Sequence, residues 1–249
     1  IAPGNGGTMK CGTNVDCKFT DFGSLREFAL ANNIDTILPG SEEAIAQGVR
    51  DFFEANADTE HIYVFSPDQY AGQLESSKSF AKEFMAKENI PTAAYQSFTH
   101  DNLVDGYAFL DGLRAPYVLK ADGLAAGKGV LILNDLSEAK TALKEMLVDK
   151  KFGNASHTVV IEAFLDGIEF SVFALTDGEK YVILPEAKDY KRIGEGDVGL
   201  NTGGMGAVSP VPFYDEVLRQ KTIQQVVEPT IAGLKNQNLN FRGFVFFGL

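Results

Sequence analysis

Residues 117–130 hold the feature that most constrains this chain: two apolar runs separated by a loop of small residues, glycines and lysines. The first run contains Lys120, and three glycines fall within the seven residues 123–129. Glycines let backbone N–H groups approach an anion without a Cβ in the way, and the ammonium groups of Lys120 and Lys128 supply countercharge. We interpret the stretch as a phosphate-binding hairpin; the simpler alternative is a hairpin with a solvated turn.

The composition excludes several kinds of partner. The chain has 249 residues with 45% hydrophobic content, enough for one to two domains with large cores. A formal net charge of −12 argues against binding to nucleic acid, and no apolar run is long enough to span a membrane. The two cysteines, Cys11 and Cys17, are too few for a zinc site. We expect them to be free thiols in a reducing, cytoplasmic environment.

The first 70 residues alternate short apolar strands with amphipathic helices, which is the pattern of an open, parallel α/β layer. Strands are predicted at residues 34–38 and 62–65, and Ser24 is the expected N-cap of the first helix. Ligands of parallel sheets lie beyond the carboxyl ends of the strands. The turn at residues 39–41, which follows the first strand, is therefore a candidate binding turn.

Two more amphipathic helices are predicted at residues 74–88 and 137–147, the second with Ser137 as its N-cap. Lys78 falls on the polar face of the first of these helices. Taken alone, such a lysine is expected to be a solvated surface residue.

The runs at residues 158–162 and 168–175 predict two strands joined by a short turn. One interpretation is a plain hairpin with charges on its rim. The other is a slot for a purine, in which backbone groups at Phe164 and Leu165 contact the edge of the base and a carboxylate accepts hydrogen bonds from ribose hydroxyls. Local evidence leaves both open.

The last distinctive stretch, residues 194–206, is rich in glycine, and Lys188, Lys191 and Arg192 come shortly before it. So much glycine predicts an irregular loop instead of a packed element, and long irregular loops are functional or disordered. Basic residues in an otherwise acidic chain favour an anion site here.

Three motifs together carry a resemblance: K-A-D-G-L-A-A-G-K-G at residues 120–129, I-E-A-F-L-D-G-I-E at 161–169 and N-T-G-G-M-G-A at 201–207. They resemble phosphoribosylamine-glycine ligase, also called glycinamide ribonucleotide synthetase, a family of the ATP-grasp superfamily. The similarity extends over nearly the whole chain. It implies an α/β (α+β ATP-grasp) fold, in which a parallel N-terminal α/β layer is followed by lid and core subdomains.

The resemblance also implies a division into domains. The expected parts are the remainder of the N-terminal domain at residues 1–72, a lid subdomain at 116–187, and an incomplete core at 73–115 and 188–249.

The activity implied is an ATP-dependent ligation in de novo purine synthesis. Glycine would attack the γ-phosphate of ATP to give glycyl phosphate, and 5-phosphoribosylamine would then displace phosphate to form glycinamide ribonucleotide. Such phosphoryl transfer needs positioning and charge neutralisation, with no protein nucleophile. Two alternatives stay open: another ATP-grasp carboxylate-amine ligase of purine synthesis, and a non-catalytic nucleotide-binding fragment. Fusion to other purine-pathway enzymes, or association with them, is also implied.

The resemblance also assigns site residues, some within these three motifs and others at matching positions elsewhere in the chain. On the ATP side they are Lys78, Lys120, Gly127, Lys128, Gly129, Glu162, Phe164, Leu165 and Glu169. On the side of glycine and the phosphoribosyl group they are Asp189, Lys191, Arg192, Asn201, Thr202, Gly203, Gly204, Met205 and Gly206. Lys120, Arg192 and Asn201 are the expected catalytic residues among them.

The implied metal is Mg²⁺ or Mn²⁺. In the family its ligands are a glutamate and an asparagine on a later strand, expected beyond Leu249, so no metal ligand is assigned within the chain. The family's first strand is likewise expected before Ile1. We therefore expect the 249 residues to be part of a longer protein.

Overall fold

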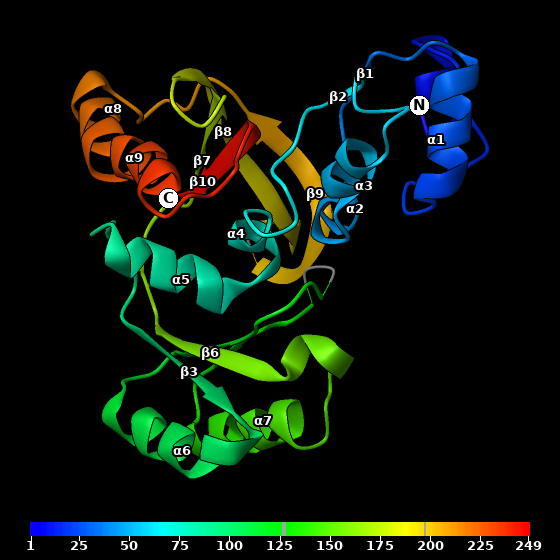
Figure 1. Ribbon diagram of the computed structural model, residues 1–249. Coiled ribbons are helices and arrows are strands. Elements are labelled where there is room, and N and C mark those ends of the chain that lie inside the picture. Colours follow the sequence, from blue (N-terminus) through cyan, green and yellow to red (C-terminus); the bar gives the residue numbers. More distant parts are fainter. Residues whose placement is uncertain (126–127, 197) are drawn as a thin grey trace.

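A computed structural model describes residues 1–125, 128–196 and 198–249, and Figure 1 shows the arrangement of its elements. The buried apolar side chains form three separate cores. Phe53 lies in the N-terminal core, Phe98 and Leu119 in the middle core, and Val172 and Leu234 in the C-terminal core. Each core lies beside its own β-sheet, and the C-terminal core also takes in residues 71–90, which precede the middle sheet in the chain.

The N-terminal part is a small parallel α/β layer, which confirms the sequence prediction for this region. Strands β1 and β2 pair in parallel, with Thr36 opposite Tyr63. The carboxylate of Asp21 accepts a hydrogen bond from the N–H of Ser24 (3.1 Å). The N-cap of α1 is therefore Asp21, and the prediction of Ser24 is wrong. The elements are η1 (Thr8–Lys10), α1 (Phe22–Ala31), β1 (Thr36–Ile37), α2 (Glu42–Ala46), α3 (Val49–Ala55) and β2 (Tyr63–Val64).

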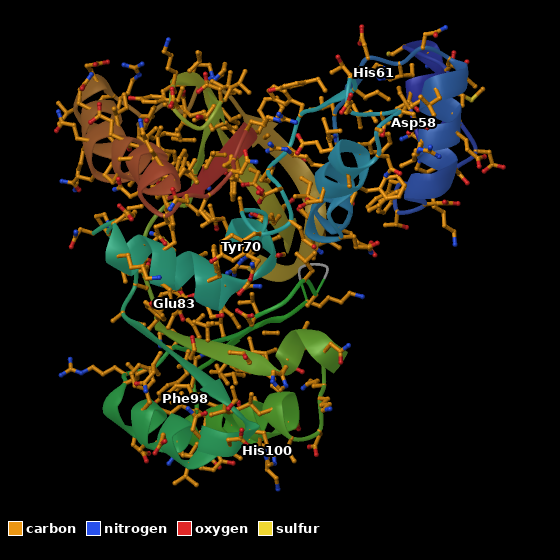
Figure 2. All side chains as sticks on the ribbon, in the orientation of Figure 1. Asp58, His61, Tyr70, Glu83, Phe98 and His100 are labelled. Atoms are coloured by element: carbon orange, nitrogen blue, oxygen red, sulfur yellow. The ribbon has the colours of Figure 1, made fainter. Side chains whose placement is uncertain are left out.

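The middle part is an antiparallel sheet of order β3-β6-β4-β5, and α6 and α7 cover one of its faces (Figure 1). Figure 2 shows Phe98 between this sheet and the two helices. Helix α7 is capped by Asp135, which accepts from the N–H of Glu138 (2.9 Å), so the predicted cap Ser137 is also wrong. The elements are β3 (Tyr95–Thr99), η2 (His100–Asn102), α6 (Leu103–Gly112), β4 (Tyr117–Ala121), β5 (Val130–Leu133), α7 (Leu136–Leu147), η3 (Gly153–Ser156) and β6 (Thr158–Ala163).

The C-terminal part is a second antiparallel sheet, of order β10-β7-β8-β9. Helices α5 and α9 supply Phe84 and Leu234 to the core that it shares with strands β7 and β10. The elements are α4 (Gln73–Ser76), α5 (Lys78–Lys87), β7 (Ser171–Thr176), β8 (Tyr181–Gly194), β9 (Val198–Val208), α8 (Glu216–Thr222), the π-helix η4 (Ile223–Val227), α9 (Glu228–Asn236) and β10 (Gly243–Gly248).

The hairpin predicted around residue 120 is confirmed, since β4 and β5 pair with Tyr117 opposite Leu133. Strands β6 and β7 do not form the other predicted hairpin. Strand β6 pairs with β3 and β4, whereas β7 pairs with β10 and β8, so the segment at residues 164–170 crosses from one sheet to the other. The physical reason is that each strand finds its partners in a different core.

The glycine-rich stretch predicted to be an irregular loop is instead part of strand β9, which pairs with β8. Tyr190 lies opposite Gly206 and Arg192 opposite Asn201, so the four residues 202–205 face the single residue Lys191. Glycine tolerates such a bulge because it adopts backbone conformations that other residues avoid. Gly204, for example, has φ +132°.

Sheet membership also differs from the predicted division of the chain, which itself stays a prediction. Strand β3, expected in the core subdomain, joins the middle sheet, and β7, expected in the lid, joins the C-terminal sheet.

Both cysteines are free thiols. Within the described ranges no helix has the length and apolar character needed to cross a membrane.

Candidate functional site

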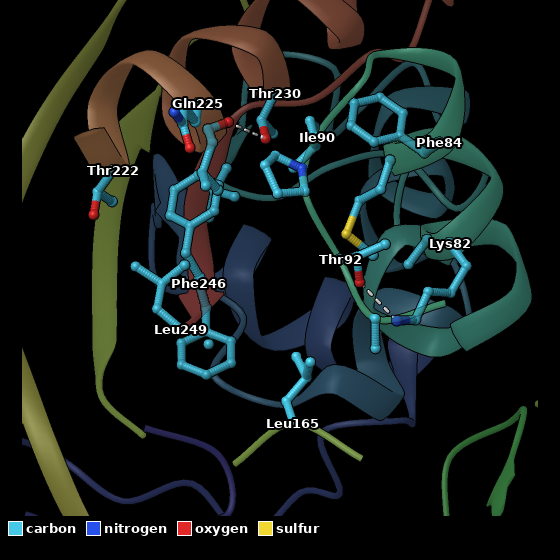
Figure 3. Close-up of a pocket in the computed structure, with 18 of the residues that line it drawn as sticks. Lys82, Phe84, Ile90, Thr92, Leu165, Thr222, Gln225, Thr230, Phe246 and Leu249 are labelled. Carbon is cyan, nitrogen blue, oxygen red and sulfur yellow. Dashed lines mark hydrogen bonds between the residues drawn. The ribbon is translucent and has the colours of Figure 1, made fainter. Parts of the chain in front are cut away.

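A cavity of about 760 Å³ lies between the two larger sheets. Its lining comes from helix α5, from the segments at residues 90–93 and 245–249, from α8, η4 and α9 at residues 218–230, and from Lys120 and Glu162 of the middle sheet. Figure 3 shows Lys82 on the α5 side and Leu165 at the lower edge of the view. The volume is within the usual range for sites that bind small molecules and cofactors.

Helix α5 directs two lysines toward the middle sheet. Lys78 and Lys82 are four residues apart and therefore lie on the same face of the helix. Phe84 packs into the C-terminal core on another face. The helix begins after Ser77, whose hydroxyl accepts a hydrogen bond from the N–H of Phe80 (3.2 Å). The amphipathic pattern of α5 thus places two ammonium groups at the cavity instead of in solvent.

The strand register brings Lys120 and Glu162 together. Val118 lies opposite Glu162, and Lys120 lies opposite Val160, so Lys120 and Glu162 are diagonal neighbours on one face of the sheet. Residues with the opposite parity, such as Leu119, face the core under α6 and α7. The charged pair therefore points away from that core and toward α5.

Glu162 bridges two lysines. Its Oε1 lies 3.0 Å from the Nζ of Lys120, and its Oε2 lies 3.1 Å from the Nζ of Lys82. The side chains of Glu162 and Lys82 are each 8% exposed, whereas that of Lys120 is 28% exposed. Lys120 is thus the member of this trio that a ligand in the cavity can reach most easily.

Asp122 ties the start of α5 to the end of strand β4. Its carboxylate accepts hydrogen bonds from the N–H of Ser79 (2.6 Å) and from the hydroxyl of Ser77 (3.1 Å). The Nζ of Lys78 donates to the backbone carbonyls of Asp122 (3.3 Å) and Gly123 (3.4 Å). Lys78 and Lys120, which are far apart in the sequence, are held at the same cavity by these contacts.

Burial lowers the pKa values of Lys78 and Lys82 below the ordinary lysine value. For Lys78 the carboxylate of Asp122 opposes this effect, and for Lys82 that of Glu162 does, but in each case burial prevails. The repulsion of Lys120 adds to the lowering of both pKa values. A negative charge brought close to these lysines stabilises their charged form, so the site favours an anionic ligand.

The loop between β4 and β5 closes through its backbone. The N–H of Ala121 donates to the carbonyl of Gly129 (2.7 Å). A Cβ at Gly129 would lie 2.8 Å from the Cβ of Ala125, so close packing explains this glycine. Lys128 is exposed in the same loop. Gly127, also predicted to contact ATP, lies outside the described residues.

The crossing segment carries the predicted base-binding residues. Phe164 and Leu165 are 42% and 71% exposed, and Leu165 borders the cavity (Figure 3). At the far end of the segment, Glu169 pairs with Lys191 of strand β8 (3.2 Å). The segment thus links the cavity to the β8–β9 hairpin.

The hairpin gathers most of the residues predicted for the acceptor side. Lys191 pairs with Asp189 (3.3 Å), and its carbonyl accepts a hydrogen bond from the hydroxyl of Thr202 (2.8 Å). Burial alone would lower the pKa of Lys191, but the carboxylates of Glu169 and Asp189 outweigh it, and the pKa is raised. Arg192 is exposed beside them. The remaining predicted residues, which lie on β9, are Asn201, Gly203, Gly204, Met205 and Gly206.

The predicted residues thus form two groups, one at the cavity and one on the hairpin. The ion pair between Glu169 and Lys191 (3.2 Å) connects a residue assigned to ATP with one assigned to the acceptors. Sequence reasoning missed Lys82 and Asp122. The spacing of four residues from Lys78 could have indicated Lys82, and the position of Asp122 directly after a buried strand could have indicated a binding-edge carboxylate.

Other enzymes of known structure share the fold of this chain. N5-carboxyaminoimidazole ribonucleotide synthetase from Thermus thermophilus matches 99% of this chain, and 59% of its own length, with a TM-score of 0.67 at 17% identity. D-alanine–D-alanine ligase from Bacillus anthracis matches 95% of this chain, and 71% of its own, with a TM-score of 0.64 at 18% identity. At such identities the likeness concerns the fold alone.

The chain belongs to the phosphoribosylglycinamide synthetase family. The family described as "Phosphoribosylglycinamide synthetase, N domain" matches residues 1–75. The family described as "Phosphoribosylglycinamide synthetase, ATP-grasp (A) domain" matches residues 76–249. The predicted ATP-grasp fold and the family resemblance are therefore confirmed.

Several relatives named phosphoribosylamine–glycine ligase are similar over the chain. One from Neisseria meningitidis is 45% identical over 249 residues, which are all of this chain and 57% of the relative. A solved structure from Thermotoga maritima is 36% identical, with a TM-score of 0.79 over 99% of this chain and 57% of its own. A bifunctional purine biosynthetic protein of Pichia angusta is 42% identical over 253 residues, 31% of its length. The chain thus spans little more than half of its single-function relatives.

Proposed function

We propose that this chain carries the nucleotide site and part of the acceptor site of an ATP-dependent ligase that joins glycine to 5-phosphoribosylamine. The observation that carries the proposal is the convergence of Lys78 and Lys120 on one cavity in a chain of net charge −12. In an acidic protein, local ammonium groups are needed to attract a polyphosphate. Family membership supports the proposed reaction class, and the charge and volume of the cavity support it as the proposed place for ATP.

In this proposal the cavity end near the middle sheet receives the phosphates. Lys78 and Lys120 neutralise them, and Lys128 and Gly129 cover them from the β4–β5 loop. The crossing segment receives adenine through backbone groups at Phe164 and Leu165, beside the buried Glu162. Glu169 then lies near the ribose. Amides and ammonium groups placed in advance stabilise the charge that builds up during phosphoryl transfer.

The acceptor substrates are assigned to the hairpin. A carboxylate oxygen of glycine attacks the γ-phosphorus, the bond to the β-phosphate oxygen breaks, and ADP leaves with the electron pair. The amine of 5-phosphoribosylamine next attacks the carbonyl carbon of glycyl phosphate, phosphate leaves, and the nitrogen loses a proton as the amide forms. Lys120 steadies the transferred phosphoryl group, and Arg192 and Asn201 orient the acceptors.

Other hairpin residues hold the acceptors in place. They are Asp189, Lys191, Thr202, Gly203, Gly204, Met205 and Gly206.

The ATP-grasp fold implies a magnesium ion. Among the described residues, no group of three or more His, Cys, Asp or Glu side chains is arranged to hold a metal. The two carboxylates nearest the lysines are already engaged, Glu162 by Lys82 and Lys120, and Asp122 by the start of α5. The described residues do not fit a magnesium site, and no step above passes through a metal.

The setting of the reaction is part of the proposal. We place the protein in the cytoplasm, where purine precursors are assembled, and fusion to another purine-pathway enzyme is a further possibility that the bifunctional relative supports. The division into an N-terminal domain at residues 1–72, a lid and a core also stays a proposal, with the lid sheet made of β3, β6, β4 and β5.

The test has a binding part and a turnover part. Calorimetry with ATP on residues 1–249 is expected to show binding, which Lys120→Met weakens. ADP release is then followed in the chain extended to the length of its relatives, with glycine and 5-phosphoribosylamine as substrates. Matched controls replace glycine by alanine, or the amine by aminoimidazole ribonucleotide. ADP release with a control pair but not with the proposed pair would disprove the assignment. ATP binding without ADP release would indicate a nucleotide-binding protein without catalysis.

A further inference from the structure

Lys82 belongs to the charged cluster beside the cavity, yet the proposed function gives it no role. Its side chain is only 8% exposed, so little of its ammonium is open to a ligand. The Nζ atom donates to the hydroxyl of Thr92 (2.7 Å; Figure 3), lies 3.1 Å from Oε2 of Glu162, and sits 5.5 Å from the centre of the Tyr95 ring. Protein groups therefore surround this ammonium.

The charges of the cluster show what Lys82 contributes. Lys82 and Lys120 share the single carboxylate of Glu162, so these three groups together carry one positive charge. Without Lys82, Glu162 and Lys120 would form a neutral pair. A phosphate would then compete with Glu162 for the only ammonium in the pair. Lys78 also acts on Lys120 by repulsion, but the carboxylate of Asp122 opposes the charge of Lys78.

We propose that Lys82 is a positioning residue of the nucleotide site: by neutralising Glu162 from its buried side, it leaves the ammonium of Lys120 available to bind phosphate. The inference rests on the proposed nucleotide site and assigns a role to a lysine whose ammonium is held by protein groups. Both lysines line the cavity, but they differ in exposure as this role requires: the side chain of Lys120 is 28% exposed and that of Lys82 is 8% exposed.

The role predicts an effect that depends on phosphate. Calorimetry gives the dissociation constants of adenosine and of ATP. The dissociation constant of adenosine divided by that of ATP measures the gain in affinity from the phosphates. In Lys82→Met this ratio is expected to fall about tenfold, the size of one charge-assisted contact, because Lys120 is held by Glu162. Adenosine affinity is expected to change by less than about twofold, since the proposed contacts of the base and ribose are made by Phe164, Leu165 and Glu169 and not by Lys82. A merely structural defect would lower the affinities for adenosine and for ATP by the same factor.

A second substitution separates positioning from packing. In the double variant Lys82→Met with Glu162→Gln the competing carboxylate is gone, so Lys120 is again unpaired. The ratio is expected to return to within about threefold of the parent. If Lys82 serves only to pack or to stabilise, the double variant binds ATP as weakly as Lys82→Met, which would overturn the inference.

Folding of the variants is checked by thermal unfolding. Should Lys82→Met not fold, Glu162→Gln alone decides: its ratio is expected to equal or exceed that of the parent, and a lower ratio overturns the inference. Lys87→Met, an exposed lysine on the same helix, is the matched control and should leave both affinities unchanged. If the parent binds no ATP, the proposed function itself is overturned. If the parent binds ATP and the ratio is unchanged in Lys82→Met, only the role of Lys82 is overturned.

Discussion

Replacing Lys120 with methionine removes the ammonium that faces the cavity and keeps most of the volume of the side chain. We expect the variant to bind ATP more weakly while retaining its fold. The neighbouring Glu162 keeps its second partner, because the Nζ of Lys82 remains 3.1 Å from Oε2. The buried carboxylate is therefore not left without a cation, and the loss in the free energy of unfolding should stay near 1 kcal/mol, that of one hydrogen bond.

The size of the loss in affinity follows from the surroundings of Lys120. With a side chain that is 28% exposed, its ammonium lies in a partly screened position. Two unit charges 4 Å apart interact by about 4 kcal/mol at an effective dielectric constant of about 20. Part of this is offset, because Lys120 loosens its contact with Glu162 when it binds a phosphate. A net contribution of about 1.5–3 kcal/mol, roughly ten- to hundredfold in affinity, is expected.

The assay is isothermal calorimetry of ATP with the parent and the variant, together with thermal unfolding of both. Lys140→Met is the matched control, since it also removes a lysine that pairs with a carboxylate, Asp111 at 2.6 Å, but does so away from the cavity. The control should bind ATP like the parent. A folded Lys120→Met variant whose affinity for ATP stays within twofold of the parent would refute the assignment of Lys120.

Three further outcomes are expected. Gly129→Ala would place a Cβ 2.8 Å from the Cβ of Ala125, and the overpacking should destabilise the protein by about 1–3 kcal/mol in urea; unchanged stability would contradict the packing argument. Arg50→Met removes a guanidinium that donates to two backbone carbonyls in a residue that is 4% exposed, and the free energy of unfolding should fall by about 3 kcal/mol. Arg26→Met, at a residue whose side chain is 32% exposed, should lower it by less than about 1 kcal/mol. Equal losses in the two variants would contradict this prediction. Burial lowers the pKa of Lys78 below 10.5, so ATP affinity should fall as the pH rises through that lowered pKa toward 10.5. In the same window the unfolded chain binds more protons than the folded one, so the free energy of unfolding should rise with pH relative to Lys78→Met; superimposable pH profiles of parent and variant would disprove this.

The sequence alone was sufficient to predict two of the strand pairings between segments that are close in the chain. The hairpin of β4 and β5 could be predicted because its two apolar runs and its glycine loop are adjacent, and the parallel pair β1 and β2 because strands and helices alternate there. The resemblance to a family also predicted that Lys78 and Lys120 serve one site, and both residues line the same cavity. Local pattern and motif content were therefore sufficient to predict the fold class and to suggest the proposed ligand.

Pairing between distant segments was decided by the tertiary structure. Nothing in the 158–175 stretch shows that β6 joins β3 while β7 joins β10, because strand pairing depends on which cores the flanking helices complete. The glycines of β9 predicted a loop, since a bulge opposite Lys191 has no local signal.

Glu162 shows the same limit at the site. In the sequence it ends a strand, where a charge is expected on the rim. In the structure it is 6% exposed, because α5, from a distant part of the chain, covers it and brings Lys82 to its carboxylate. Burial and charge pairing depend on what packs against a residue, and only the tertiary structure brings those groups together.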